Sequence, residues 1–183
     1  MSYIEKNIAI ILIHLFILIV PLISLNAQDV EVDRVYSKTL IGAGISGVLT
    51  NSSYGEENVG IDLFVRHNFS SLVIPNSYCC INVNYNNYKD DYSITKEDYS
   101  ASLGGLYISD PIKTHPTVSL SYCFGAEVGV LYKKELYYAC MGISTGFVFK
   151  IYKNLNFEAI LKTKYNPSDD FFTEGMIGLS YSL

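Results

Sequence analysis

The residues of this sequence best able to do chemistry are eight charged side chains, each set in a run where small or polar residues alternate with apolar ones. They are Asp62, Arg66, Glu127, Lys150, Glu158, Lys162, Lys164 and Glu174. Successive side chains of a strand point to opposite faces, so these residues share the polar faces of their segments. Enclosed together, they could form a proton or ion path, or pair with one another to offset desolvation. We expect pairing, by Arg66 with Asp62 or by the lysines of segment 156–165 with Glu127 and Glu174.

Acidic residues also occur in pairs, in the polar stretches between the apolar runs. They are Glu56, Glu57, Asp90, Asp91, Glu97, Asp98, Asp169 and Asp170. In an up-and-down barrel all of these stretches lie at the end opposite the termini, which is extracellular if the termini are periplasmic. We expect solvated loops there, with binding of divalent cations or of a partner protein as the alternatives.

The four cysteines are predicted to be unbridged. They are Cys79, Cys80, Cys123 and Cys140, and the first two point to opposite faces of one strand. A hairpin that turns at Lys133-Lys134 pairs Cys123 with Ser144 and places Cys140 opposite Glu127, about 13 Å from Cys123. We therefore interpret the cysteines as packing residues. Their spacing matches no metal site, and we expect neither a metal nor a cofactor.

The elements that position these side chains are eight segments of period two. They are 38–49, 59–69, 79–86, 99–108, 118–130, 137–151, 156–165 and 171–183. Short connections without room for crossover helices join them, so the pattern predicts an all-β, up-and-down antiparallel barrel. The last segment sets Ile177, Leu179, Tyr181 and Leu183 on one apolar face.

The first residues have the composition of a secretory signal. Lys6 precedes a run of Ile, Leu and Val over 8–23, and Ala27 offers a small residue for cleavage. We predict a signal peptide over 1–27, a short periplasmic segment over 28–37 and the barrel over 38–183. Gln28 as the new N-terminus resembles usage in Bacteroidota. An uncleaved anchor helix is the alternative, but His14 and Pro21 interrupt the apolar run.

The volume of an eight-stranded barrel decides which face is the interior. The apolar rows contain bulky residues such as Phe124, Phe147, Phe157 and Tyr165, which eight strands cannot enclose all round. We therefore expect the glycines and charges inside and the bulky rows outside, against lipid, with tyrosines at the interfaces: Tyr36, Tyr99, Tyr107, Tyr132, Tyr137 and Tyr165. A secreted lipocalin-like barrel, with the faces reversed, is the alternative.

With its leader, its strand count and its terminal Tyr181-x-Leu183, the chain resembles the small eight-stranded outer-membrane barrels of Gram-negative bacteria, the OmpX-like, OmpA-barrel and porin-family type. The resemblance covers nearly all of the chain after the leader. It implies a monomer in outer-membrane lipid, inserted by the barrel-assembly machinery that reads the last strand. It also implies a non-enzymatic envelope protein that contacts a host surface or extracellular ligand through its loops. The mild net charge of −5 and the lack of a basic stripe give no reason to expect nucleic acid.

Two other functions remain open. A small-solute or ion pore would use the inward charges. A lipid-modifying enzyme would need a histidine with a nucleophile. His67 and Ser70 resemble the His and Ser of outer-membrane lipid A deacylases, with a different spacing and in the periplasmic leaflet. His115 lies in a turn between prolines. We expect no enzymatic activity.

Overall fold

The computed structural model describes residues 39–50, 58–68, 76–89, 94–115, 118–167 and 170–183. All of them belong to one unit, Tyr36–Leu183. The predicted signal peptide over 1–27 and periplasmic segment over 28–37 lie outside these residues. In the described part of the chain, no helix has the length and apolar character needed to cross a membrane.

Within the described residues the chain forms nine strands. They are β1 (Thr39–Thr50), β2 (Asn58–Asn68), β3 (Ser77–Lys89), β4 (Thr95–Ile108), β5 (Ile112–His115), β6 (Val118–Lys133), β7 (Leu136–Tyr152), β8 (Leu155–Asn166) and β9 (Asp170–Ser182).

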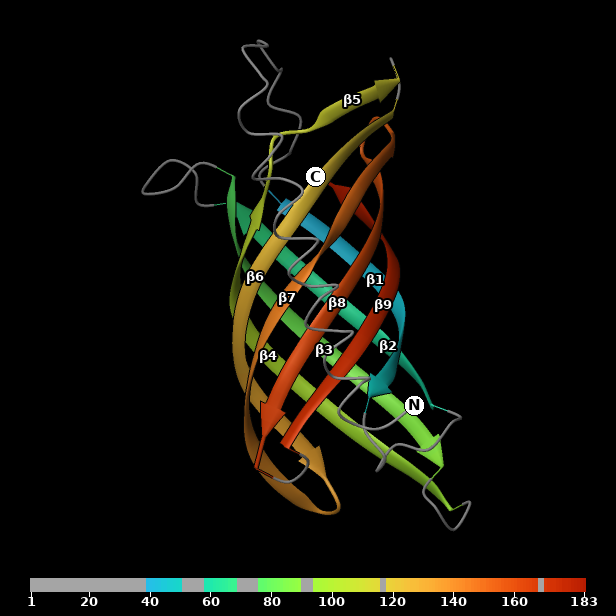
Figure 1. Cartoon of the computed structure of the whole chain (residues 1–183), viewed down its shortest axis with the longest axis vertical. Coiled ribbons are helices and arrows are strands. Elements are labelled where there is room, and N and C mark those ends of the chain that lie inside the picture. Colours follow the sequence, from blue (N-terminus) through green and yellow to red (C-terminus); the bar gives the residue numbers. More distant parts are fainter. Residues whose placement is uncertain (1–38, 51–57, 69–75, 90–93, 116–117, 168–169) are drawn as a thin grey trace. The chain divides into compact units, whose positions relative to one another are not determined.

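Eight of these strands close into an antiparallel barrel, which confirms the predicted fold class (Figure 1). Each pairs with its neighbours in the chain, β4 pairs with β6, and β1 pairs with β9 to close the sheet. The short β5 was not predicted. It begins directly after Pro111, which cannot donate to a ladder, and pairs with the start of β6.

The pairing register makes the barrel narrow and strongly tilted. Paired residues can be followed from strand to strand once around the barrel. Starting at Phe147 on β7, this path passes Ile177 on β9, Ile45 on β1 and Tyr85 on β3, and it returns to β7 at Tyr137. The strands are therefore staggered by ten residues around the barrel. Eight strands with this stagger tilt by about 40° and leave an interior that side chains fill. We call the end where β1 begins and β9 ends the proximal end, and the opposite one the distal end.

Burial alternates along the strands as the period-two pattern predicts. On β2 the side chains of Asp62, Phe64 and Arg66 are buried inside, whereas Leu63 and Val65 are exposed outside. Phe64, Leu106 and Ile108 interrupt the polar face of the sequence pattern. All three lie in an apolar cluster in the barrel interior. They fill the lumen that the small residues would otherwise leave empty.

Aromatic side chains mark two levels on the outer surface. On β3, β4, β6 and β7 the rings of Tyr85, Tyr99, Tyr132 and Tyr137 form a row with centroid distances of 5.2, 6.4 and 4.9 Å. On β6 itself Tyr122 lies ten residues before Tyr132. At about 3.3 Å per residue and a tilt of about 40°, these two levels are about 25 Å apart along the barrel axis, the height of the apolar band of a membrane barrel.

The β6–β7 hairpin turns one residue later than predicted. Lys133 pairs with Leu136, so the turn is Lys134-Glu135, and both residues have positive φ, 51° and 64°. A two-residue turn with two positive φ angles matches the right-handed twist of the flanking strands. The predicted partner of Cys123, Ser144, was therefore wrong. Cys123 pairs with Gly146, and Cys140 pairs with Gly129.

The β3–β4 hairpin is longer than predicted. β3 continues to Lys89 and β4 already begins at Thr95. Glu97 and Asp98, expected in a loop, therefore belong to a strand. Glu97 is exposed, whereas Asp98 is only 1% exposed and faces the lumen.

Candidate functional site

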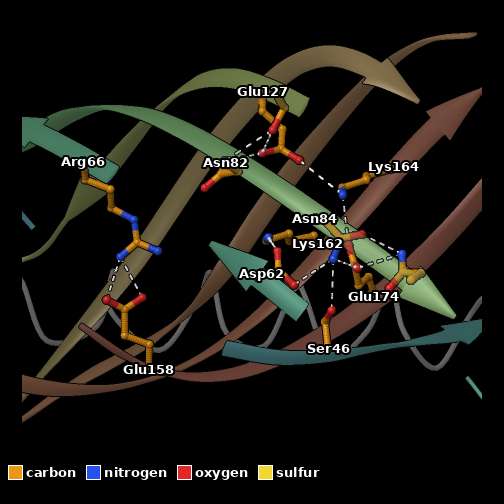
Figure 2. A network of polar contacts seen from close by, with 12 residues as sticks. Ser46, Asp62, Arg66, Asn82, Asn84, Glu127, Glu158, Lys162, Lys164 and Glu174 are labelled. Carbon is orange, nitrogen blue, oxygen red and sulfur yellow. Dashed lines mark hydrogen bonds and ion pairs between the residues drawn. The ribbon is translucent and has the colours of Figure 1, made fainter. Parts of the chain in front are cut away.

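Charged and amide side chains fill the middle of the lumen and contact one another across it (Figure 2). Of the eight charged residues predicted to face inward, seven are buried or nearly so. They are Asp62, Arg66, Glu127, Glu158, Lys162, Lys164 and Glu174. The eighth, Lys150, lies on the inner face near the proximal end of β7 and is partly exposed.

Arg66 and Glu158 form an ion pair at the proximal side of this network. Arg66 Nη1 lies 2.7 Å from both carboxylate oxygens of Glu158, and the two side chains are 3% and 0% exposed. The Arg66 guanidinium also lies over the ring of Phe64, 4.1 Å from its centroid. The predicted pair of Arg66 with Asp62 was wrong. The two residues are four apart on β2, about 13 Å along the strand.

Asp62 pairs with Lys162 across the lumen, from β2 to β8. Asn84 on β3 connects this pair to the next one. Its Nδ2 lies 2.9 Å from Asp62 Oδ2, 3.0 Å from Glu174 Oε1 and 3.1 Å from Ser46 Oγ. One amide therefore holds side chains from β1, β2 and β9 in contact.

Lys164 connects two acidic residues, Glu127 and Glu174, as predicted, whereas the same prediction was wrong for Lys162, which pairs with Asp62. Its Nζ lies 2.9 Å from Glu174 Oε2 and 3.8 Å from Glu127 Oε1. Glu127 Oε2 accepts hydrogen bonds from Asn82 Nδ2 at 2.8 Å and from Ser102 Oγ at 2.9 Å. The carboxylates thus reach several strands, and the network extends from β1 to β9.

Apolar side chains form a cluster in the lumen on each side of the network. The proximal cluster includes Leu40, Phe64, Tyr78, Leu106, Ile108, Cys123, Val148, Ile160 and Met176. The distal cluster is Val48, Tyr88 and Phe172. Lys133 adds a charge at the distal end, 3.8 Å from Asp98 and 5.4 Å from the Tyr88 ring centroid.

A small cavity remains between the Arg66 level and the central network. Its volume is about 20 Å³, and its lining includes Cys80, Asn82, Glu127, Ser144 and Lys162. A space of this size holds about one water molecule.

The sequence pattern did not identify the asparagines that organise the network. Asn82, Asn84 and Asn86 alternate along β3 with Val83 and Tyr85, and all three hydrogen-bond with acidic residues or with one another. Three inward amides on one strand are the signal that could have identified them. Buried amides need hydrogen-bond partners, and the inward carboxylates and hydroxyls of neighbouring strands are candidates.

The structure describes the surroundings of His67 and of the four cysteines. His67 faces outward, and its Nδ1 lies 3.0 Å from Thr39 Oγ1. Ser70 lies outside the described residues. The four cysteines are free; Cys80, Cys123 and Cys140 are buried, and Cys79 is partly exposed. Among the described residues, His, Cys, Asp and Glu do not gather into a group that could hold a metal ion.

The remaining predicted residues lie near the barrel's ends or on its outer wall. Ile177, Leu179, Tyr181 and Leu183 are exposed on the outer face of the last strand. Of the acidic residues, Glu56, Glu57, Asp90, Asp91 and Asp169 lie outside the described residues, and Asp170 begins β9. The prediction that Asp98 lies in an extracellular loop was wrong. Asp98 is buried in the distal end beside Lys133, because β4 begins three residues before it.

Comparison with solved structures finds this fold in outer-membrane β-barrel proteins. Neisserial surface protein A is similar with a TM-score of 0.55 and 11% identity, over 80% of this chain and 98% of that one. Ail, the attachment invasion locus protein of Yersinia pestis, is similar with a TM-score of 0.51 and 14% identity, over 81% and 99%. No protein-family model and no curated protein matches the sequence. The fold is that of a small eight-stranded outer-membrane β-barrel, as the sequence resemblance predicted.

Proposed function

We propose that this chain, with the fold of a small outer-membrane β-barrel, is a closed and non-enzymatic barrel of a Gram-negative outer membrane that acts through its distal end. Its outer wall supports a membrane location. Ile45, Ile61, Leu63 and Val128 are more than half exposed on that wall, and water is a poor environment for so many contiguous apolar groups. The aromatic levels about 25 Å apart fit the interfaces of such a membrane.

The observation that carries the closed state is the filled lumen. Ion pairs and amides occupy its centre, and apolar clusters occupy both sides. A pore would need a continuous polar passage, whereas the cavity of about 20 Å³ holds about one water molecule. We therefore favour a structural or contact role over conduction.

The distal end is where we propose that contact with a partner or host surface occurs. Leu136, next to the β6–β7 turn, is 57% exposed. Similar barrels carry names that refer to attachment and to the cell surface. Export by the signal peptide over 1–27 and insertion by the barrel-assembly machinery belong to the same proposal.

The test is location and topology in a Gram-negative host. We expect the full chain to fractionate with the outer membrane, to lose its leader, and to migrate faster on a gel before boiling than after it. An epitope inserted between Lys134 and Glu135 should be detected on intact cells, and one placed after Lys153, in the proximal β7–β8 turn, should not. A protein that stays soluble and folded without detergent would contradict the proposal.

A further inference from the structure

The proximal end of the lumen carries a lysine that has no acidic partner. Lys150 lies on the inner face of β7 and is partly exposed, so solution reaches its ammonium group. In the part of the chain that the structure describes, the ion pairs of the lumen use other cations, namely Arg66, Lys133, Lys162 and Lys164. The positive charge of Lys150 is therefore available to a ligand.

The acidic residues nearest to this end are already engaged. Glu158 is the next inward residue of β8 beyond the strand partner of Lys150, and both of its oxygens lie 2.7 Å from Arg66 Nη1. Asp110, in the connection between β4 and β5, accepts a hydrogen bond from Asn76 Nδ2 at 2.7 Å. Proximal to Glu158, the inner faces of the described strands carry no other acidic side chain.

The residues beside Lys150 are neutral and can donate hydrogen bonds. The register pairs Lys150 with Ser119 on β6 and with Asn156 on β8, and the row continues from Asn156 to Ser180 on β9. The Cα atoms of such partners lie about 5 Å apart. One ammonium group is thus flanked by hydroxyl and amide groups from three other strands.

Ser119 provides a second, independent observation. Its side chain is 8% exposed and faces the lumen, yet its Oγ has no hydrogen-bond partner among the described residues. Buried polar atoms are nearly always hydrogen-bonded. Because Ser119 is the direct strand partner of Lys150, one acceptor from outside the chain could contact both groups.

The serines of β9 add donors that face the same end of the lumen. Asn156 Nδ2 lies 3.2 Å from Ser180 Oγ and 3.5 Å from Ser182 Oγ, and all three side chains are at most 5% exposed. Each hydroxyl accepts in these contacts and keeps its own hydrogen for donation. If the amide is turned the other way, the serines donate to Oδ1 and the amide hydrogens become available instead.

We propose that the proximal end of the lumen binds the phosphate group of a phosphodiester through the ammonium of Lys150 and the hydroxyl of Ser119. A phosphodiester carries one negative charge, which matches the single charge of Lys150. Lysine binds phosphate as a point charge. A tetrahedral phosphate also presents acceptors in several directions, which suits donors from several strands, whereas the acceptors of a carboxylate lie in one plane.

The ligand stays at this end because apolar side chains lie deeper in the lumen. Leu40, Ile108 and Val148 are each 0% exposed and belong to the proximal apolar cluster. The phosphodiester can belong to a lipid headgroup that reaches over the barrel rim or to a soluble compound. Both sources offer the same group to Lys150 and Ser119.

The experiment is phosphorus-31 NMR with the folded full barrel in an amine-oxide detergent, which contains no phosphorus. We titrate the barrel into dimethyl phosphate, a soluble phosphodiester, or into dihexanoyl phosphatidylglycerol, and we measure line width. The unmodified barrel should broaden the line in a saturable manner, and the boiled barrel should not. Saturable broadening of both probes identifies the phosphodiester group as sufficient, and broadening of the lipid alone identifies a headgroup as the source.

Matched variants locate the effect and separate it from lipid that merely shares the micelle. Lys150→Gln should weaken binding about tenfold or more, because it removes a charge-assisted hydrogen bond, and Ser119→Ala should weaken it about fivefold. Lys150→Arg keeps the charge and should retain most of the affinity. The control is Lys153→Gln, the same charge change at an exposed residue next to β7, which should leave binding unchanged.

Three results would overturn the proposal. The first is no saturable broadening of either probe, and the second is an equal loss in Lys150→Gln and Lys153→Gln, which would mean a general attraction to basic residues. The third is displacement by acetate at the concentration at which dimethyl phosphate displaces itself, because the site would then not select phosphate. The proposed closed barrel does not depend on this ligand, so each of these results leaves that function standing.

Discussion

Replacing Arg66 with Met should destabilise the barrel strongly, because it leaves the Glu158 carboxylate buried without its cation. Glu158 is 0% exposed and loses both 2.7 Å contacts with Arg66 Nη1. Removing one partner of a buried pair costs about 3–5 kcal/mol. At about 2–4 °C per kcal/mol for a domain of this size, the unfolding midpoint should fall by about 10 °C.

The double variant Arg66→Met with Glu158→Leu separates the pair from its surroundings. Leu40, Cys80 and Val148, the strand partners of these residues, belong to the proximal apolar cluster, so two apolar side chains fit there. The double variant should recover most of the loss, because replacing a buried ion pair by apolar residues is often neutral. We would measure reversible urea unfolding in lipid vesicles by circular dichroism. A double variant as unstable as the sum of the two single variants would refute this reasoning.

Three further predictions test packing, turn and exposure. Gly60→Ala should lower the free energy of unfolding by about 1–3 kcal/mol, because the added methyl group would meet inward polar groups. The matched control is Gly105→Ala, whose methyl group would meet nothing within 4 Å and which should unfold like the wild type in urea. Changing Lys134-Glu135 to Asn-Gly should stabilise by about 0.5–1 kcal/mol, because both positions have positive φ, and an unchanged or lower urea midpoint would argue against this turn. In the folded barrel the membrane-permeant N-ethylmaleimide should label Cys79, on the outer wall, and no other thiol, as counted by mass spectrometry. Labelling of several thiols before unfolding would contradict the burial of the others.

The faces of the strands could be predicted from the sequence because the period of two is local. Asp62, Arg66, Glu158 and Lys162 all lie on the predicted face. A strand with one apolar face can place that face against lipid in only one orientation, with its polar face toward the lumen. This orientation follows from each segment independently.

Partners across the lumen could not be predicted in the same way, because they depend on closure and stagger. Which carboxylate reaches Arg66 depends on how far β8 is shifted relative to β2, and several turns contribute to that shift. The spacing of Arg66 and Asp62 on one strand could nevertheless have excluded that pair. Asp98 was missed for a related reason. The first residues of β4, around Asp98, are mostly polar and give no strand signal. They belong to the strand because they pair with β3, which the composition of β4 alone does not indicate.

Single-channel recording tests the central claim, that the lumen is closed, most directly. We would insert the purified full barrel into planar lipid bilayers and record current in sodium or potassium chloride, with insertion checked by gel mobility of the recovered protein. The filled lumen predicts no discrete conductance steps. Regular steps of one size, abolished by Gly104→Trp on the inner wall, would contradict it and would make the chain a pore.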